Sequence, residues 1–354
     1  MSRTKSNQPD PLAKAFSKDN QIYFRLQTAL MEDVSYNSVI GRNLVNFAFL
    51  DQDLLERCML EFFAVYVQWR DRGVHPDIIE EELVERSRRL FVRNSYLSIY
   101  LLGYAQFLMD EVIDPRIFSG ITGDDKSLLN LILKEKSEGI PDTLKSDMIS
   151  VLIRSYESKR KRAEKALKIV WEASQGDTRT PVERYCHLEQ EDSFFRKHWH
   201  STFTTTLGVW DAETGESVRF TVLETIDDML RYEMVQLLVE GVGYKFCKNC
   251  GMPFIPSGRS DALYCDRIMA GQEKPCNKIG ANLAAKKKVA RTPALKIYRQ
   301  AYQRMNKRME QGYLEREAYD SWVTEAVEKR DQCLAGELSY KEFAHWINAT
   351  SRRR

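Results

Sequence analysis

The sequence predicts a mainly α protein, α+β overall, with a helical N-terminal domain and a C-terminal module that contains a β-hairpin, a four-cysteine finger and helices. Apolar side chains recur at three- and four-residue steps through most of the first 200 residues, which is typical of amphipathic helices. Alternation at every second residue begins near residue 201 and predicts two short strands. The chain has 354 residues, 43% hydrophobic and 29% charged, so a globular protein of about two domains is expected.

The N-terminal region is predicted to be a loose tail followed by the helical domain. Residues 1–20 are polar and contain proline, so we expect little packed structure there. The helical domain then extends over about residues 21–200, and its motifs indicate no function.

Four helices are predicted within this domain. Amphipathic patterns indicate helices at residues 54–69 and 77–93, the second of which begins after a proline. A more apolar pattern at 95–114 predicts a helix in the core. Residues 142–174 are compatible with one long helix.

The C-terminal module is expected to span residues 201–354 and to begin with the hairpin. Residues 201–210 and 218–222 alternate between apolar and polar side chains and are separated by a turn-rich segment. A helix follows, because Thr225 is a suitable N-cap and Asp228 stands three residues later.

Four cysteines in this module have the spacing of a metal site. Cys247 and Cys250 are separated by two residues, and Cys265 and Cys276 follow after fourteen and ten more. A two-residue gap directs two sulfurs at one ion, and four thiolates complete a closed tetrahedral shell around Zn²⁺. We therefore predict one structural zinc ion in a finger at about 244–291. Cys276 is expected at the start of a helix, where the helix dipole favours a thiolate.

Two other uses of these cysteines are possible. A redox C-x-x-C motif would leave Cys265 and Cys276 without a role. An iron–sulfur cluster also takes four cysteines, but the spacing fits no ferredoxin pattern.

The N-terminal segment has no apolar signal core and no apolar run is long enough to span a bilayer, so we expect a cytoplasmic protein with no membrane segment. Because the cytoplasm keeps thiols reduced, we do not expect the cysteines to form a disulfide framework.

Positive charge is concentrated around and after the finger. Residues 245–308 contain 15 basic and 3 acidic side chains, a net charge of +12. Because the whole chain carries +2, the remainder carries −10. Such asymmetry indicates a polyanionic partner, although some of these bases would only neutralise a zinc–thiolate cluster of charge −2.

A basic helix is predicted at 293–311, with an apolar side that we expect to pack on the finger. The candidate phosphate-binding residues are basic side chains on or just before this helix: Lys286, Lys287, Lys288, Arg291, Lys296, Arg299, Arg304, Lys307 and Arg308. Nucleic acid, with DNA favoured over RNA, is the first candidate partner of this surface. A solvated face and an acidic protein partner are the alternatives.

The segment from Val218 to Trp346 resembles the C-terminal region of an uncharacterised domain-of-unknown-function family of Gram-positive bacteria. The matching features are short motifs in the same order: Cys247-Lys-Asn-Cys250-Gly251 with Phe254, Tyr264-Cys265, Cys276, Tyr298-Arg299-Gln-Ala-Tyr302, Asn306-Lys307-Arg308, and the pairs Gly312…Trp322 and Gly336…Trp346. The resemblance implies a zinc-binding finger and no established activity. The finger also resembles, more weakly, treble-clef-like fingers of bacterial regulators, but its longer gap before Cys276 and its lack of Gly-Asn-Arg weaken the implication of nucleic-acid binding.

No catalytic motif is found, and we expect that the protein is not an enzyme. None of the five histidines lies in the finger, and phosphate-binding glycine loops and nucleophile elbows are missing. The leading hypothesis is a zinc-finger protein that binds nucleic acid through the basic helix, with a regulatory role as the candidate use. The alternative is a protein-interaction or scaffold module in which zinc is purely structural.

Overall fold

The structure is a computed structural model that describes residues 11–28, 30, 34–50, 52–91, 94–118, 140–199, 203–211, 216–257, 259–269 and 271–352. The chain forms two compact units. The N-terminal unit comprises Met1–Phe246 and Met252–Ala262, and the C-terminal unit comprises Cys247–Gly251 and Leu263–Arg354. Most described residues are helical, which confirms the predicted fold class.

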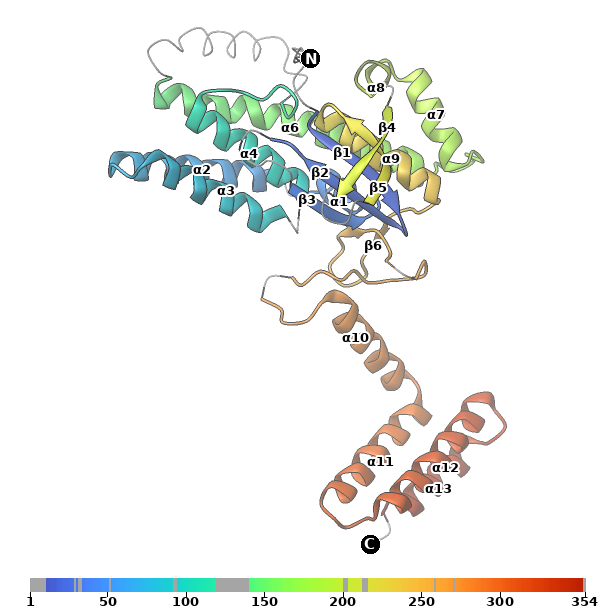
Figure 1. The fold of residues 1–354 in the computed structure, drawn as a ribbon. Helices are drawn as coiled ribbons and strands as arrows, with labels where there is room; N and C mark the ends of the chain where they lie inside the picture. Colours follow the sequence, from blue (N-terminus) through green and yellow to red (C-terminus); the bar gives the residue numbers. More distant parts are fainter. Residues whose placement is uncertain are drawn as a thin grey trace. The chain divides into compact units, whose positions relative to one another are not determined.

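The N-terminal unit contains seven strands and eight helices among its described residues (Figure 1). The strands are β1 (Ala13–Lys18), β2 (Gln21–Leu26), β3 (Val34–Val39), β4 (Thr204–Asp211), β5 (Glu216–Leu223), β6 (Lys245–Phe246) and β7 (Pro253–Phe254). The helices are α1 (Arg42–Ala48), α2 (Gln52–Asp71), α3 (Pro76–Phe91), α4 (Ser95–Asp110), α6 (Asp142–Trp171), α7 (Pro181–Glu191), α8 (Ser193–His198) and α9 (Ile226–Glu240).

Five strands form one antiparallel sheet in the order β3-β2-β1-β5-β4. Residues 13–18, which we expected in a loose tail, form β1 instead, while residues 1–10 lie outside the described part of the chain. The predicted β4–β5 hairpin is present, but β5 pairs with β1, Ala13 lying opposite Leu223. The hairpin therefore belongs to the N-terminal unit and not with the finger, because strand pairing joins segments that are 200 residues apart in the sequence.

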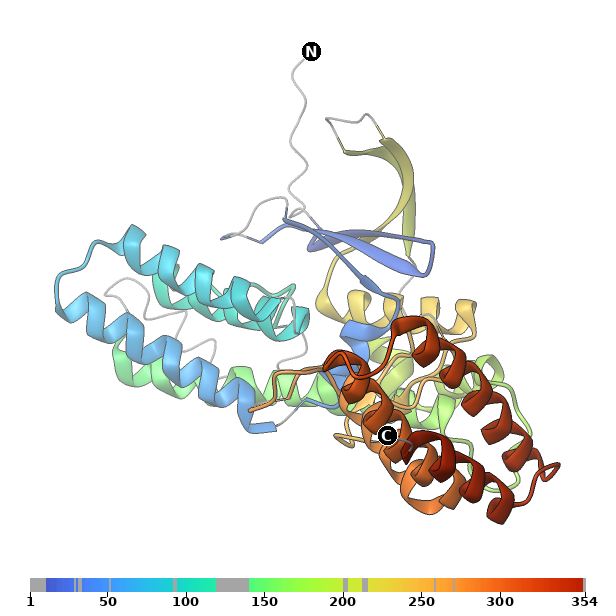
Figure 2. The same ribbon diagram turned by 90° about the horizontal axis from the view of Figure 1, so that it is seen from below.

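The predicted helices of the N-terminal region form a layer beside this sheet. Figures 1 and 2 show α2, α3, α4 and α6 side by side, with the β4–β5 hairpin extending beyond the other strands. Helix α4 is buried from Ser95 to Leu108, which confirms its predicted place in the core. Its Tyr100 packs edge to face with Tyr156 of α6, the ring centroids being 4.8 Å apart.

A buried carboxylate joins the two layers. Helix α1 has no capping side chain of its own, and Glu233 of α9 accepts a hydrogen bond from the Leu44 backbone N–H at 3.1 Å in its first turn. The Tyr96 hydroxyl donates to the other oxygen of Glu233 at 3.0 Å. Glu233 is fully buried, and burial raises its pKa from 4.5 to about 7 against the effect of these donors.

Glu233 is expected to make the N-terminal unit less stable as the pH rises. The pKa of this carboxyl is higher in the folded state than in the unfolded chain, so its contribution is fully present below pH 4.5 and is lost between pH 4.5 and about 7. A pKa shift of this size corresponds to a change of about 3 kcal/mol in the free energy of unfolding. Urea unfolding of the wild type and of Glu233→Gln at pH 4.5 and 8 measures the difference. Parallel pH profiles of the two proteins would contradict this assignment.

A second buried charged group lies between α6 and α9. Asp227, in the first turn of α9, lies 3.7 Å from Lys159 Nζ and 3.4 Å from Arg162 Nη2. The side chain of Lys159 is 1% exposed and that of Arg162 is 7% exposed. Burial lowers the pKa of Lys159 to about 8, although Asp227 favours its charged form. The neighbouring Asp228 instead completes the predicted capping box with Thr225.

The C-terminal unit contains the cysteines, a connecting helix and a three-helix bundle. Its helices are α10 (Cys276–Arg291), α11 (Pro293–Glu310), α12 (Arg316–Ala335) and α13 (Tyr340–Arg352). Gly336, with φ +83°, ends α12 in the left-handed conformation, which a glycine adopts without steric cost. Trp322 is buried in the bundle, and its indole N–H donates to Thr350 at 3.1 Å.

The apolar side of α11 packs within this bundle. Ala301 and Met305 are buried together with Tyr319 of α12 and Phe343 and Ile347 of α13. The expected packing of α11 on the finger is therefore wrong, because the two Gly…Trp helices provide its apolar partners. In the part of the chain that the structure describes, no helix is both long and apolar enough to cross a membrane.

Candidate metal centre and cationic surface

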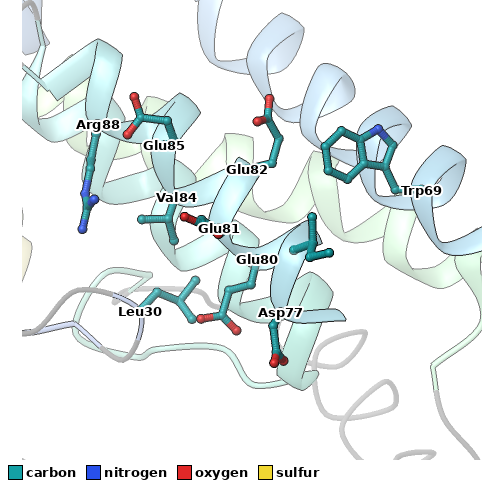
Figure 3. A pocket seen from close by; sticks show the side chains of 10 residues that line it. Leu30, Trp69, Asp77, Glu80, Glu81, Glu82, Val84, Glu85 and Arg88 are labelled. Carbon is teal, nitrogen blue, oxygen red and sulfur yellow. The ribbon is translucent and has the colours of Figure 1, made fainter. Parts of the chain in front are cut away.

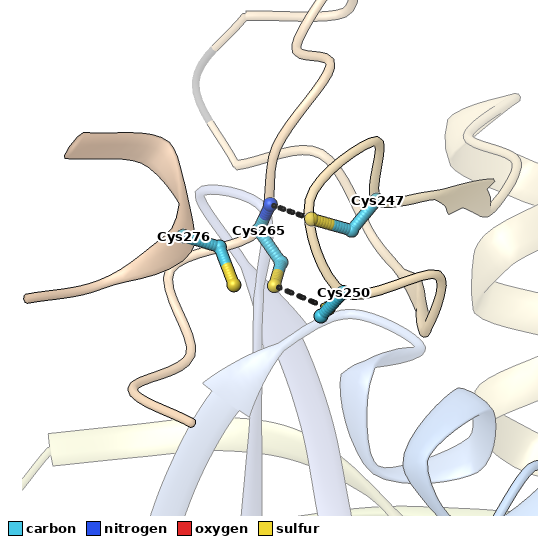
Figure 4. A group of neighbouring side chains, drawn as sticks. All are labelled: Cys247, Cys250, Cys265 and Cys276. Carbon is cyan, nitrogen blue, oxygen red and sulfur yellow. Dashed lines mark hydrogen bonds between the residues drawn. The ribbon is translucent and has the colours of Figure 1, made fainter. Parts of the chain in front are cut away.

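The four predicted cysteine ligands come together in the C-terminal unit. The sulfur atoms of Cys247, Cys250, Cys265 and Cys276 all lie within 4.8 Å of one another (Figure 4). Three of the cysteines are buried and Cys250 is half-buried. Four sulfurs bound to one ion at about 2.3 Å are separated by about 3.8 Å in a tetrahedron, so the cluster is compatible with a metal ion. The remaining cysteines, Cys58, Cys186 and Cys333, are not part of it.

The first two ligands lie on a tight turn. The Gly251 N–H donates to the Cys247 carbonyl at 2.8 Å, and Gly251 has φ +74°, a conformation that a residue with a Cβ rarely adopts. The Cys265 N–H donates to the Cys247 sulfur at 3.3 Å. The Asn249 amide donates to the Cys276 sulfur at 3.3 Å. Such donors orient thiolates and disperse their negative charge.

The last ligand begins a helix, as predicted. Cys276 is the first residue of α10, and its N–H donates to the Arg267 carbonyl at 2.9 Å. The next N–H, of Asn277, donates to the Cys265 carbonyl, so backbone hydrogen bonds tie the helix to the loop that carries the third ligand. One turn into α10, Gly280 lies against Tyr264, whose ring atoms are 2.2 Å from the position of a Cβ. A residue larger than glycine would push the helix away from the cysteines.

The thiol groups are electrostatically coupled. Burial raises the pKa of Cys247, but the N–H groups of Cys250, Cys265 and Asn249 outweigh it and lower that pKa to about 6. Burial and the neighbouring thiols Cys247 and Cys250 raise the pKa of Cys265 well above its ordinary value. Four neighbouring thiols do not all ionise in the absence of a cation, because their negative charges repel one another. A divalent cation bound between them offsets this repulsion.

The predicted phosphate-binding residues fall into two groups. Seven are exposed: Lys286, Lys287, Lys288 and Arg291 on α10, and Lys296, Arg299 and Lys307 on α11. We call these seven side chains the cationic surface. The other two are half-buried: Arg304 donates to the Ser351 hydroxyl at 2.9 Å, and Arg308 lies 3.8 Å from the Met305 sulfur. Burial lowers the pKa of Arg304, and the charge of Arg352 contributes.

Helix α10 is unusually open to solvent. Only Cys276 and Gly280 are buried, and residues 281–288 are exposed on every side of the helix. The sequence contains no acidic residue from 274 to 309. No residue of the cationic surface forms an ion pair with any described residue. These charges are therefore available to an external anion.

A separate cavity in the N-terminal unit has the opposite charge. It measures about 630 Å³ and lies along α3, whose acidic residues Asp77, Glu80, Glu81, Glu82 and Glu85 are among those that line it (Figure 3). Trp69, Leu30 and Arg88 complete part of its wall. Burial raises the pKa of Glu80, and the charges of Asp110 and Asp77 add to this effect. The sequence suggested only a helix start here, because it does not show that the acids share a cavity.

The four cysteines lie within a region that is similar to a known protein family. Residues 202–351 match the model of a family of unknown function (DUF6076). This region is similar to DUF6076. The matched segment extends from the β4–β5 hairpin through the four cysteines to α13, and it brings no activity with it. Neither the curated proteins nor the solved structures include a significant match to the chain.

Proposed function

We propose that the protein is a zinc-dependent nucleic-acid-binding protein, in which Cys247, Cys250, Cys265 and Cys276 hold one structural Zn²⁺ and the cationic surface contacts phosphates. Zinc suits the site because it prefers tetrahedral sulfur ligands. Four cysteines leave no open coordination position, so the ion orders the finger and has no catalytic role.

The observation that carries the second half of the proposal is the exposure of α10. A helix normally buries an apolar stripe, yet α10 exposes residues 281–288 on all sides and carries Lys286, Lys287 and Lys288 among them. Its first residue is a cysteine of the metal centre, so the proposed ion fixes the start of the helix. A rigid cationic helix with no nearby acids suits a polyanion.

Charge reversal on α10 is expected to remove most DNA binding. Lys286→Glu, Lys287→Glu and Lys288→Glu in one variant replace three phosphate contacts with repulsion. For duplex DNA of random sequence, each lost contact lowers the slope of log affinity against log salt by about 0.9, so the slope should fall by about 2.7. A titration of the wild type and the variant between low and physiological salt measures both slopes.

The matched control reverses three exposed cations of the N-terminal unit, Arg72, Arg88 and Arg89, and so changes the net charge equally. This control should bind DNA nearly as the wild type does. Equal affinity of the α10 variant and the wild type, or no binding by the wild type at physiological salt, would contradict the proposal. Binding of an acidic protein in place of DNA would then favour an interaction module.

A further inference from the structure

A small group of aromatic side chains, two of which come just before Cys247 in the sequence, lies on the surface of the N-terminal unit. It consists of Phe49, which follows α1, together with Tyr244 and Phe246 beside the two-residue strand β6. We call these three residues the aromatic cluster. We propose that the aromatic cluster stacks on an unpaired nucleobase, so that the protein binds single-stranded nucleic acid in preference to duplex. This inference rests on the proposed function.

The cluster presents one ring to solvent while its own members pack together. Phe246 is 52% exposed, and its ring lies edge to face with Phe49 at 6.1 Å and with Tyr244 at 5.7 Å. Phe49 and Tyr244 are 5.3 Å apart. A half-exposed phenylalanine held by two further rings is an apolar surface that water does not favour. Its open area suits a planar aromatic group.

The rings are held in place before any ligand binds. The Tyr244 hydroxyl donates a hydrogen bond to Glu172, at the end of α6. Lys168 of α6 lies over the Phe49 ring, 5.8 Å from its centroid. Phe246 pairs with Pro253 of β7 through the short β6–β7 ladder. A preorganised platform loses little conformational entropy when a base stacks on it.

The space next to the cluster suits a nucleotide. Lys161, Lys165 and Lys168 line a hollow of about 350 Å³ on α6 together with Glu164. Lys165 pairs with Asp192 and Lys168 with Glu164, and Lys161 forms no ion pair with a described residue. A second hollow of about 360 Å³ is lined by Tyr244 and Lys245. A nucleotide combines a planar ring with a phosphate, and aromatic rings interleaved with lysines recognise both. Bases within a duplex already stack on one another, so their faces are not available to Phe246.

The test compares single-stranded and duplex DNA, each about 16 nucleotides long, binding to the full chain. Phe246→Ala should weaken binding of single-stranded DNA about tenfold or more and leave duplex binding unchanged. Phe246→Trp should retain the affinity, and its indole fluorescence should be quenched by single-stranded DNA. Tyr313→Ala removes an aromatic residue that is 74% exposed on the C-terminal unit and serves as the matched control. Metal content shows that each variant keeps an intact finger.

The outcomes separate this inference from the proposed function. If Phe246→Ala leaves single-strand affinity unchanged while the α10 charge reversal abolishes binding, stacking is refuted and phosphate contact stands. Equal losses for single-stranded and duplex DNA would also refute stacking, because they indicate a general structural defect. If the wild type binds neither form, both proposals fail. Replacement of DNA by RNA of the same sequence shows which unpaired strand is preferred.

Discussion

Replacement of Cys276 by serine is expected to abolish stoichiometric metal binding and to unfold the finger. Cys276 is both a member of the four-sulfur cluster and the first residue of α10, so its loss opens the coordination shell and releases the helix start. Structural zinc sites contribute about 10–16 kcal/mol of apparent binding free energy in finger peptides, and few other contacts replace this here. Among the described residues from 266 to 288, only Cys276 and Gly280 are buried.

Elemental analysis of reductively purified protein and hydrogen exchange measure the two parts of this prediction. The wild type should hold one metal ion per chain, and Cys276→Ser much less. Backbone amides of the finger and of α10 should lose protection, whereas those of the α11–α13 bundle should keep it because Phe343 and Ile347 give the bundle its own core. A strong chelator should reproduce the effect in the wild type.

The control is Cys186→Ser, which alters an exposed cysteine outside the cluster and should leave metal content unchanged. A Cys276→Ser protein that binds one equivalent of metal with wild-type affinity would show that the fourth sulfur is not a ligand. Normal protection of α10 in metal-free protein would show that the ion does not order the finger.

Replacement of Asp227 by asparagine is expected to cause the largest loss of stability in the N-terminal unit. Asp227 lies beside the buried cations Lys159 and Arg162, and removal of one partner of a buried ion pair typically costs about 3–5 kcal/mol. Urea unfolding at neutral pH measures the loss. The neighbouring Asp228→Asn is the matched control and should cost about 1 kcal/mol, because Asp228 belongs to the capping box of α9 and not to the ion pairs with Lys159 and Arg162.

The pH and a second substitution identify the cause of this loss. The pKa of Lys159 is about 8 in the folded state, below its ordinary 10.5, so the folded protein releases this proton first and gains stability as the pH rises from about 8 to 10.5. The cost of Asp227→Asn should therefore be smaller at pH 10 than at pH 7, with the Arg162 part remaining. Addition of Lys159→Met to Asp227→Asn should restore part of the stability. A loss below about 1 kcal/mol at pH 7 would refute the role of Asp227.

The local patterns in the sequence predicted several elements well. The apolar repeats of α2, α3 and α4 and the cap of α9 depend on neighbours within one or two turns, and the structure confirms these elements. The long helix expected at 142–174 is α6, which ends at Trp171. The alternation of Ile22, Phe24 and Leu26 in β2 was a strand signal that helical periodicity nearby concealed.

The sequence by itself determined the composition of the candidate metal centre, because cysteine is the residue that supplies thiolates and a two-residue gap places two of them at one turn. It also determined the basic segment, since charge is a property of composition. Only the tertiary structure decided that β1 pairs with β5, that Glu233 caps α1, that Asp227 meets Lys159, and that Phe246 joins Phe49 at the surface. These contacts join residues distant in the chain, and their energies depend on burial and geometry that no local pattern contains.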